Sequence, residues 1–282
     1  MLLAACGAGS ATAGNTPSTA AAAKPAAIYS GPSGVLGGAQ PQPNGLMWLL
    51  AGSSTAKTLQ ELNVTTGKIA LIVPESASAV SVAQLSSGVI GVGAATASTG
   101  SLELRNGSSG ALLGTVALGA PVKAVASGFD GQTFYVLNGN ATSSSVTLVN
   151  AQTAKASISV PVPLDTTSVA VDPLGQQIYA LGSDGSLRAI SVVTGTISAQ
   201  FAKLTDPSSL VMSDSGATLY ALQTTRTGSN VAVVDVATEQ QTEALPAPGS
   251  AVGIQLSPDN RSLYAIVGSA QYGNVQVFPL SS

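Results

Sequence analysis

The sequence has no histidine, one cysteine and few charges. Of its 282 residues, 10 are Lys or Arg and 13 are Asp or Glu, which is 8% of the chain, against a usual value of about 25%. The absence of histidine excludes a histidine general base, a Ser-His-Asp triad and histidine metal ligands. A single cysteine excludes internal disulfide bonds and thiolate zinc clusters. The net charge of −3 and the pI near 4.8 give none of the basic surface that nucleic acid binding requires.

Apolar residues are abundant, but they are not arranged as a membrane span. They make up 45% of the chain, and no stretch of 18 is uninterrupted, so no transmembrane helix is predicted. The length allows one or two domains, and all-β domains of about 200 to 250 residues often form one unit. A chain this long buries about three quarters of its unfolded surface, so its core needs no disulfide or metal.

The first six residues resemble the end of a bacterial lipoprotein signal peptide. Leu3-Ala4-Ala5-Cys6 matches the lipobox. The resemblance implies cleavage before Cys6 and lipid attachment there, hence an extracytoplasmic protein anchored to the cell membrane. The charged part and most of the apolar part of a signal peptide are missing, so either the chain begins late within its gene or the match is accidental. The alternative role for Cys6 is that of a small buried apolar residue.

A tether is predicted to follow Cys6. Residues 7–24 are almost wholly Gly, Ala, Ser, Thr, Asn and Pro, and such a segment buries too little surface to offset the entropy of ordering it. We therefore expect residues 1–25 to hold the signal end, the lipidation site and a disordered tether. The folded domain is expected over residues 26–282.

The remainder of the chain repeats with a period near 43 residues. A turn recurs before an apolar, often tyrosine-bearing strand, with its second position at 45, 88, 131, 175, 216 and 260. Gly, Asn and Asp supply the positive φ that such turns need. About 22 residues later a second turn recurs, as in Asn63-Val64-Thr65-Thr66-Gly67 and Asp235-Val236-Ala237-Thr238-Glu239. Each repeat therefore holds four short strands, and no amphipathic helix of useful length is found.

Six repeats of four strands predict an all-β fold, a β-propeller with six four-stranded blades, with seven also possible. The sixth repeat ends where its fourth strand should begin. Residues 26–30 align with that missing strand, and residues 34–40 align with the first strand of the first repeat. An N-terminal strand is therefore expected to complete the last blade and close the ring, which hides both sheet edges.

The repeats resemble the YVTN-type, YncE-like propeller repeats of bacterial extracytoplasmic proteins. The best matches are Ser257-Pro258-Asp259-Asn260-Arg261-Ser262-Leu263-Tyr264 and Val233-Val234-Asp235-Val236-Ala237-Thr238. Familiar members of this family often have seven blades, whereas this chain has six repeats. The repeats do not resemble WD40 units, because the only tryptophan, Trp48, is not followed by aspartate.

Ligands of propellers usually meet the face formed by the second-to-third strand loops and the connections between blades. Charges expected on this face are Lys57, Glu75, Lys123, Asp165, Asp184, Lys203, Asp206 and Arg226. The tentative ligand-facing residues are Asp165, Asp184, Lys203, Asp206 and Arg226. The three aspartates are the only plausible carboxylate trio for a metal, and Lys203 with Arg226 could hold an anion. The alternative for the aspartates is turn chemistry, and for the cations a solvated loop charge.

Three functions are compatible with this pattern. The first is a non-catalytic binding or interaction module with an envelope protein or glycan as its ligand. Such a module needs no catalytic residues, metal or cofactor, and we expect it to be a monomer. The second is a lactonase-like, metal-dependent hydrolase, which rests on fold analogy alone. The third is a scaffold that spaces other envelope proteins. The sequence does not choose a ligand among them.

Overall fold

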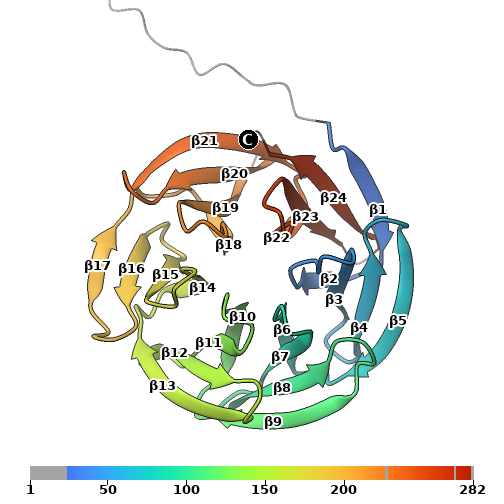
Figure 1. The fold of residues 1–282 in the computed structure, drawn as a ribbon, viewed down its shortest axis with the longest axis horizontal. Coiled ribbons are helices and arrows are strands. Elements are labelled where there is room, and N and C mark those ends of the chain that lie inside the picture. Colours follow the sequence, from blue (N-terminus) through green and yellow to red (C-terminus); the bar gives the residue numbers. More distant parts are fainter. Residues whose placement is uncertain (1–23, 226–227, 270, 281–282) are drawn as a thin grey trace, which may run out of the picture.

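The computed structural model describes residues 24–225, 228–269 and 271–280. It shows six four-stranded antiparallel sheets arranged in a ring (Figure 1), so the predicted β-propeller with six blades is confirmed. No helix occurs among these residues, and accordingly none of them forms a helix that could cross a membrane.

Blades are numbered in chain order, and their strands run from the channel outward. Blade 1 consists of β2 (Val35–Gly38), β3 (Leu46–Gly52), β4 (Lys57–Asn63) and β5 (Lys68–Glu75). Blade 2 consists of β6 (Ala79–Gln84), β7 (Val89–Ala95), β8 (Gly100–Asn106) and β9 (Leu112–Leu118). Blade 3 consists of β10 (Val122–Ser127), β11 (Thr133–Gly139), β12 (Ser144–Asn150) and β13 (Lys155–Pro161). Blades 4 and 5 consist of β14 (Thr166–Val171), β15 (Gln177–Gly182), β16 (Leu187–Ser191) and β17 (Ile197–Gln200); and β18 (Pro207–Met212), β19 (Thr218–Thr225), β20 (Gly228–Asp235) and β21 (Gln240–Ala247).

Blade 6 is built from both ends of the described chain. It contains β22 (Ala251–Leu256), β23 (Ser262–Gly268) and β24 (Gly273–Pro279), and its outermost strand is β1 (Ala27–Gly31). Ala27 pairs with Val277, and Gly31 pairs with Gly273. This is the predicted ring closure, visible in Figure 1 where blue β1 lies beside red β24.

The two faces of the ring differ in the loops that form them. The face called here the upper face carries the second-to-third strand loops and the connections between blades. The lower face carries the other turns. Because β1 runs antiparallel to β24, its first residue, Ala27, lies at the lower face and its last residue, Gly31, at the upper face.

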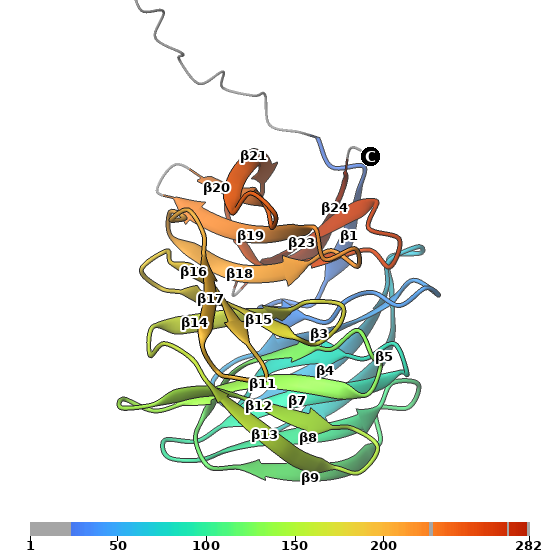
Figure 2. The same ribbon diagram turned by 60° about the vertical axis from the view of Figure 1, so that its left-hand side comes forward.

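The core lies between the blades, whose ribbons Figure 2 shows in a second view. Each cluster of buried side chains joins two neighbouring blades; Phe134 of blade 3, for example, packs with Leu102 and Leu104 of blade 2. Trp48 of blade 1 is fully buried against Val82 and Ile90 of blade 2. Each such side chain stabilises the fold by about 1.5 to 3 kcal/mol. This explains why the inner strands are apolar on both faces.

The lower-face turns use the expected chemistry. Asp130 Oδ1 accepts the N–H groups of Gln132 and Thr133, each at 2.9 Å, and Asn63 Oδ1 accepts those of Thr65 and Thr66 at 2.9 and 2.8 Å. These bonds lower the pKa of Asp130, although its burial opposes them as the largest single effect. The last position of the second turn has positive φ even where it is Ala154 or Glu239, with values of 51° and 60°.

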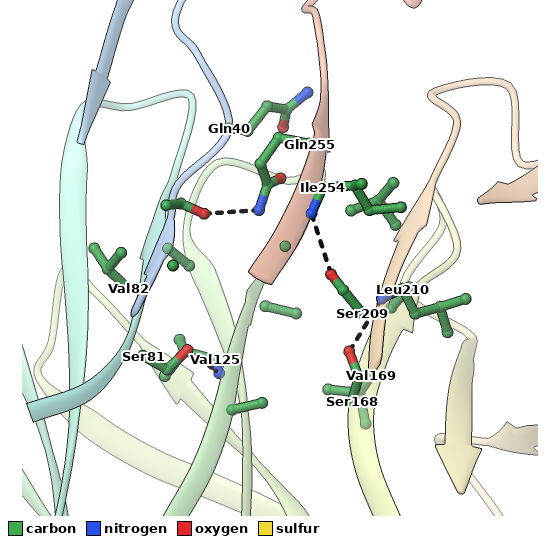
Figure 3. Close-up of a pocket in the computed structure, with 18 of the residues that line it drawn as sticks. Gln40, Ser81, Val82, Val125, Ser168, Val169, Ser209, Leu210, Ile254 and Gln255 are labelled. Carbon is green, nitrogen blue, oxygen red and sulfur yellow. Dashed lines mark hydrogen bonds between the residues drawn. The ribbon is translucent and has the colours of Figure 1, made fainter. Parts of the chain in front are cut away.

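Polar contacts tie each blade to the next near the channel (Figure 3). At three joints a serine hydroxyl accepts a main-chain N–H of the following blade: Ser81 from Val125 at 3.0 Å, Ser168 from Leu210 at 3.2 Å and Ser209 from Ile254 at 3.4 Å. Gln255 Nε2 donates to the Gly38 carbonyl at 2.8 Å across the closing joint. At the other two joints lysines donate to carbonyls: Lys57 to Ala79 and Lys123 to Leu164.

Candidate functional site in the upper face

A channel of about 240 Å³ runs between the innermost strands of the six blades. Each of these strands contains a register shift of one residue near its upper end. Such a bulge bends the strand and redirects the extra side chain. The six bulge residues line the cavity, and we call them the mouth ring: Leu36, Val80, Lys123, Thr167, Ser208 and Val252.

Beside this mouth, four charged side chains gather over blade 4. Arg188 Nη1 lies 3.6 Å from Asp165 Oδ1, and Lys203 Nζ lies 4.0 Å from Asp184 Oδ2. Ser186 Oγ donates to Asp165 Oδ2 at 3.4 Å, and the Ser186 N–H donates to Asp184 Oδ1 at 2.9 Å. We call Asp165, Asp184, Arg188 and Lys203 the upper charge cluster.

Gly182 lies beneath the upper charge cluster. A Cβ at Gly182 would collide with the oxygens of Asp165, Asp184 and Ser186, so the two carboxyl groups converge over a main-chain position that has no side chain. Hydrogen bonds from the Ser186 side chain and main chain, with the charge of Lys203, hold the pKa of Asp184 well below its usual range. Asp184 is therefore ionised throughout ordinary solution conditions.

The predicted site residues are brought together only in part. Asp165, Asp184 and Lys203 meet in the upper charge cluster. Asp206 instead occupies a turn with φ of 42°, where its carbonyl accepts the Thr224 N–H at 3.0 Å. Arg226 and Cys6 lie outside the described residues. In the described part of the chain, no three Asp, Glu, Cys or His side chains form a group that could hold a metal, so the aspartate trio is not assembled.

The side chain of Glu75 is not exposed on the upper face, although its position in the sequence predicts that it would be. Its side chain is fully buried, and Arg105 Nε of blade 2 lies 2.6 Å from Glu75 Oε1. Arg105 also contacts Glu103 Oε2 at 2.8 Å and donates to the Gly110 carbonyl at 3.1 Å. Burial raises the pKa of Glu75, and the charge of Arg105 opposes that rise. We call Glu75, Glu103 and Arg105 the joint charge cluster, which lies between blades 1 and 2.

Sequence reasoning missed two functional features. Arg188 stands within a strand, and nothing in its neighbourhood marks it as the partner of Asp165. The bulges leave no local signal either, because they are defined by pairing with the next strand. Five members of the mouth ring stand eight residues before the repeated turn position and Leu36 stands nine before it, and this near-constant spacing is the signal that could have found the mouth ring.

These features define the protein as a six-bladed propeller with a polar and charged upper face. In comparisons with known proteins, no family model and no curated protein matches the chain.

Proposed function

We propose that this protein is a membrane-anchored, extracytoplasmic binding module that takes its ligand on the upper face. The observation that carries the proposal is the upper charge cluster beside the channel mouth. Lys203 and Asp184 keep 69% and 48% of their side chains exposed, so they are paired with each other yet open to a partner. Exposed pairs of this kind contribute little stability, which leaves recognition as their use.

The path of the chain supports the orientation of this module. The segment that follows the lipobox cysteine joins β1 at the lower face. A lipid on Cys6 would therefore hold the lower face toward the membrane and leave the upper face directed into the surroundings. A flexible tether spans about 5 to 6 Å times the square root of its number of residues, which is enough to extend past the lipid headgroups.

The chemistry of the upper face favours a polar ligand such as an envelope protein or a glycan. Two carboxylates, two cations and the hydroxyl groups of serine and threonine lie on this face. Together they offer hydrogen-bond donors and acceptors on a rigid scaffold. Loops on a rigid disc vary without disturbing the core, and propellers are suited to recognition for this reason.

The test is crosslinking in native cells with the chain extended to a complete signal peptide, followed by mass spectrometry. Three proteins are compared: the wild type, Asp184→Lys, and Thr194→Lys as a matched lower-face control. Anchoring is measured separately by fatty-acid labelling of the wild type and Cys6→Ser. We expect labelling that needs Cys6, and a partner lost in Asp184→Lys but retained in Thr194→Lys.

Three outcomes would contradict the proposal. Fatty-acid labelling that is unchanged in Cys6→Ser would overturn the anchor. A partner retained in both lysine variants would overturn recognition through the upper charge cluster and favour a scaffold that binds elsewhere. Divalent-metal-dependent hydrolysis of a lactone by the purified chain, lost in Asp184→Lys, would replace the binding module by the hydrolase.

A further inference from the structure

The mouth ring is divided into an apolar half and a polar half. Blades 6, 1 and 2 contribute Val252, Leu36 and Val80, whose exposed fractions are 37%, 42% and 36%. Blades 3, 4 and 5 contribute Lys123, Thr167 and Ser208. The three residues of each half are neighbours around the ring, so one side of the channel mouth is apolar and the opposite side is polar.

The apolar half of the mouth ring is exposed to water, which is unfavourable in free energy, and a bound ligand that covered it would remove this cost. Three aliphatic side chains converge on one cavity, and covering apolar surface contributes about 25 cal/mol per Å². Single exposed apolar residues need no explanation, whereas a contiguous group at a cavity marks a binding surface. The bulges make this exposure possible, because in a regular strand the same positions would turn toward a neighbouring blade.

Lys123 on the polar half has no carboxylate partner. Its Nζ lies 3.5 Å from Ser144 Oγ and 3.4 Å from the Leu164 carbonyl, both neutral oxygens at long distance. Arg105, Arg188 and Lys203 each have a carboxylate within 4.0 Å, but in the described part of the chain none lies this close to Lys123. Lys123 lines the channel, whereas Ser144 and Leu164 do not, so its ammonium group is a positive charge beside the channel mouth that remains available to an anion.

We propose that the channel mouth binds a small amphipathic organic anion, with its carboxylate at Lys123 and its aliphatic part against Leu36, Val80 and Val252. This deepens the proposed function, on which it rests, by naming a ligand class for the same face. The channel volume of about 240 Å³ lies below the roughly 300 Å³ at which pockets for drug-sized ligands begin. The ligand is accordingly a short aliphatic acid or the acidic end of a longer molecule.

Calorimetric titration of the purified full chain with octanoate tests this inference, with 1-octanol and octyltrimethylammonium as neutral and cationic probes of the same length. The variants are Lys123→Met, Lys123→Arg and Val252→Ser. Lys57→Met is the matched control, because Lys57 also donates to a carbonyl at a blade joint but does not line the channel. Melting temperatures establish that each variant is folded.

We expect octanoate to bind more tightly than both other probes. Lys123→Met and Val252→Ser should each weaken octanoate by at least tenfold, while Lys123→Arg and Lys57→Met leave it within about twofold. Equal binding of octanoate and octanol, or no loss in folded Lys123→Met, would overturn the role of the ammonium group. If no probe binds while Asp184-dependent capture in cells persists, the ligand class is wrong and the binding module stands.

Discussion

The joint charge cluster and the upper charge cluster contain the same kinds of side chain in different surroundings. In the joint charge cluster, Glu75 is fully buried and Arg105 is 13% exposed. In the upper charge cluster, Lys203 and Asp184 are 69% and 48% exposed, and their closest atoms lie 4.0 Å apart. The Glu75–Arg105 pair is therefore close and shielded from solvent, whereas the Lys203–Asp184 pair is more widely spaced and exposed to solvent.

The difference in burial predicts how much each ion pair contributes to the stability of the fold. Removing one partner of a buried pair leaves an uncompensated charge away from water, which costs several kcal/mol. An exposed pair loses almost nothing when it is broken. The charges between blades 1 and 2 therefore stabilise the fold, whereas the exposed pair over blade 4 contributes little to it.

The largest expected effect comes from breaking the joint charge cluster. Arg105→Met should lower the free energy of unfolding by about 3 to 5 kcal/mol, because Glu75 is then buried without a cation. Lys203→Met, which breaks the exposed pair of the upper charge cluster, should cost less than about 1 kcal/mol. Urea denaturation of both variants measures this contrast, and equal losses would show that the buried pair contributes nothing special.

Trp48 sharpens the comparison from the apolar side of the same joint. It is fully buried, and its Nε1 donates to the Gly107 carbonyl of blade 2 at 3.2 Å. Trp48→Phe removes this hydrogen bond and leaves a small cavity, so we expect a loss of about 2 kcal/mol. Thermal unfolding followed by circular dichroism is the measurement. A change below about 0.5 kcal/mol would mean that the joint repacks freely.

Glu61 provides a pH-dependent contrast within this joint. It is 6% exposed and pairs across the strands with Trp48, and burial raises its pKa. The folded state therefore binds the Glu61 proton more tightly than the unfolded state, so protonation of this group adds stability as the pH falls through its folded pKa, and its ionised form lowers stability above that pKa. Other groups with shifted pKa values are the same in wild type and variant and cancel in their difference.

Glu61→Gln should accordingly stabilise the protein at pH 7, where the buried carboxylate is replaced by a neutral amide. The gain should shrink as the pH falls through the raised pKa of Glu61, because Glu61 itself then becomes protonated. Urea titrations at pH 4 and pH 7 give the two values. A gain that is the same at both pH values would contradict ionisation of Glu61 as its cause.

The smallest expected change in stability is in the upper charge cluster. Asp184→Asn should leave the melting temperature within error, because the side chain is open to solvent, yet it should abolish capture of the upper-face partner. The pKa of Asp184 lies well below its usual range, so capture by the wild type should persist at pH 4.5. Loss of capture between pH 7 and pH 4.5 would contradict a role for the ionised Asp184.

Several features of the fold could be predicted because they are local or periodic. The six turns that precede the second strand of each blade repeat at nearly constant spacing, and four of these strands carry a tyrosine. A repeat of four strands has few ways to bury both faces of each sheet. The closing role of β1 followed from the same alignment. The turn residues Asp130 and Asn63 were predictable because their side chains bond to N–H groups two and three positions along the chain.

The sequence by itself determined the four-stranded blades, their turns and the strand that closes the ring, because each depends on neighbours along the chain or on one repeating period. Only the tertiary structure decided which charges are buried. Glu75 and Arg105 belong to different blades, and their pairing depends on how one sheet packs on the next. The bulges that redirect Leu36, Val80 and Lys123 into the channel are likewise defined by the register between strands, which no single segment of sequence encodes.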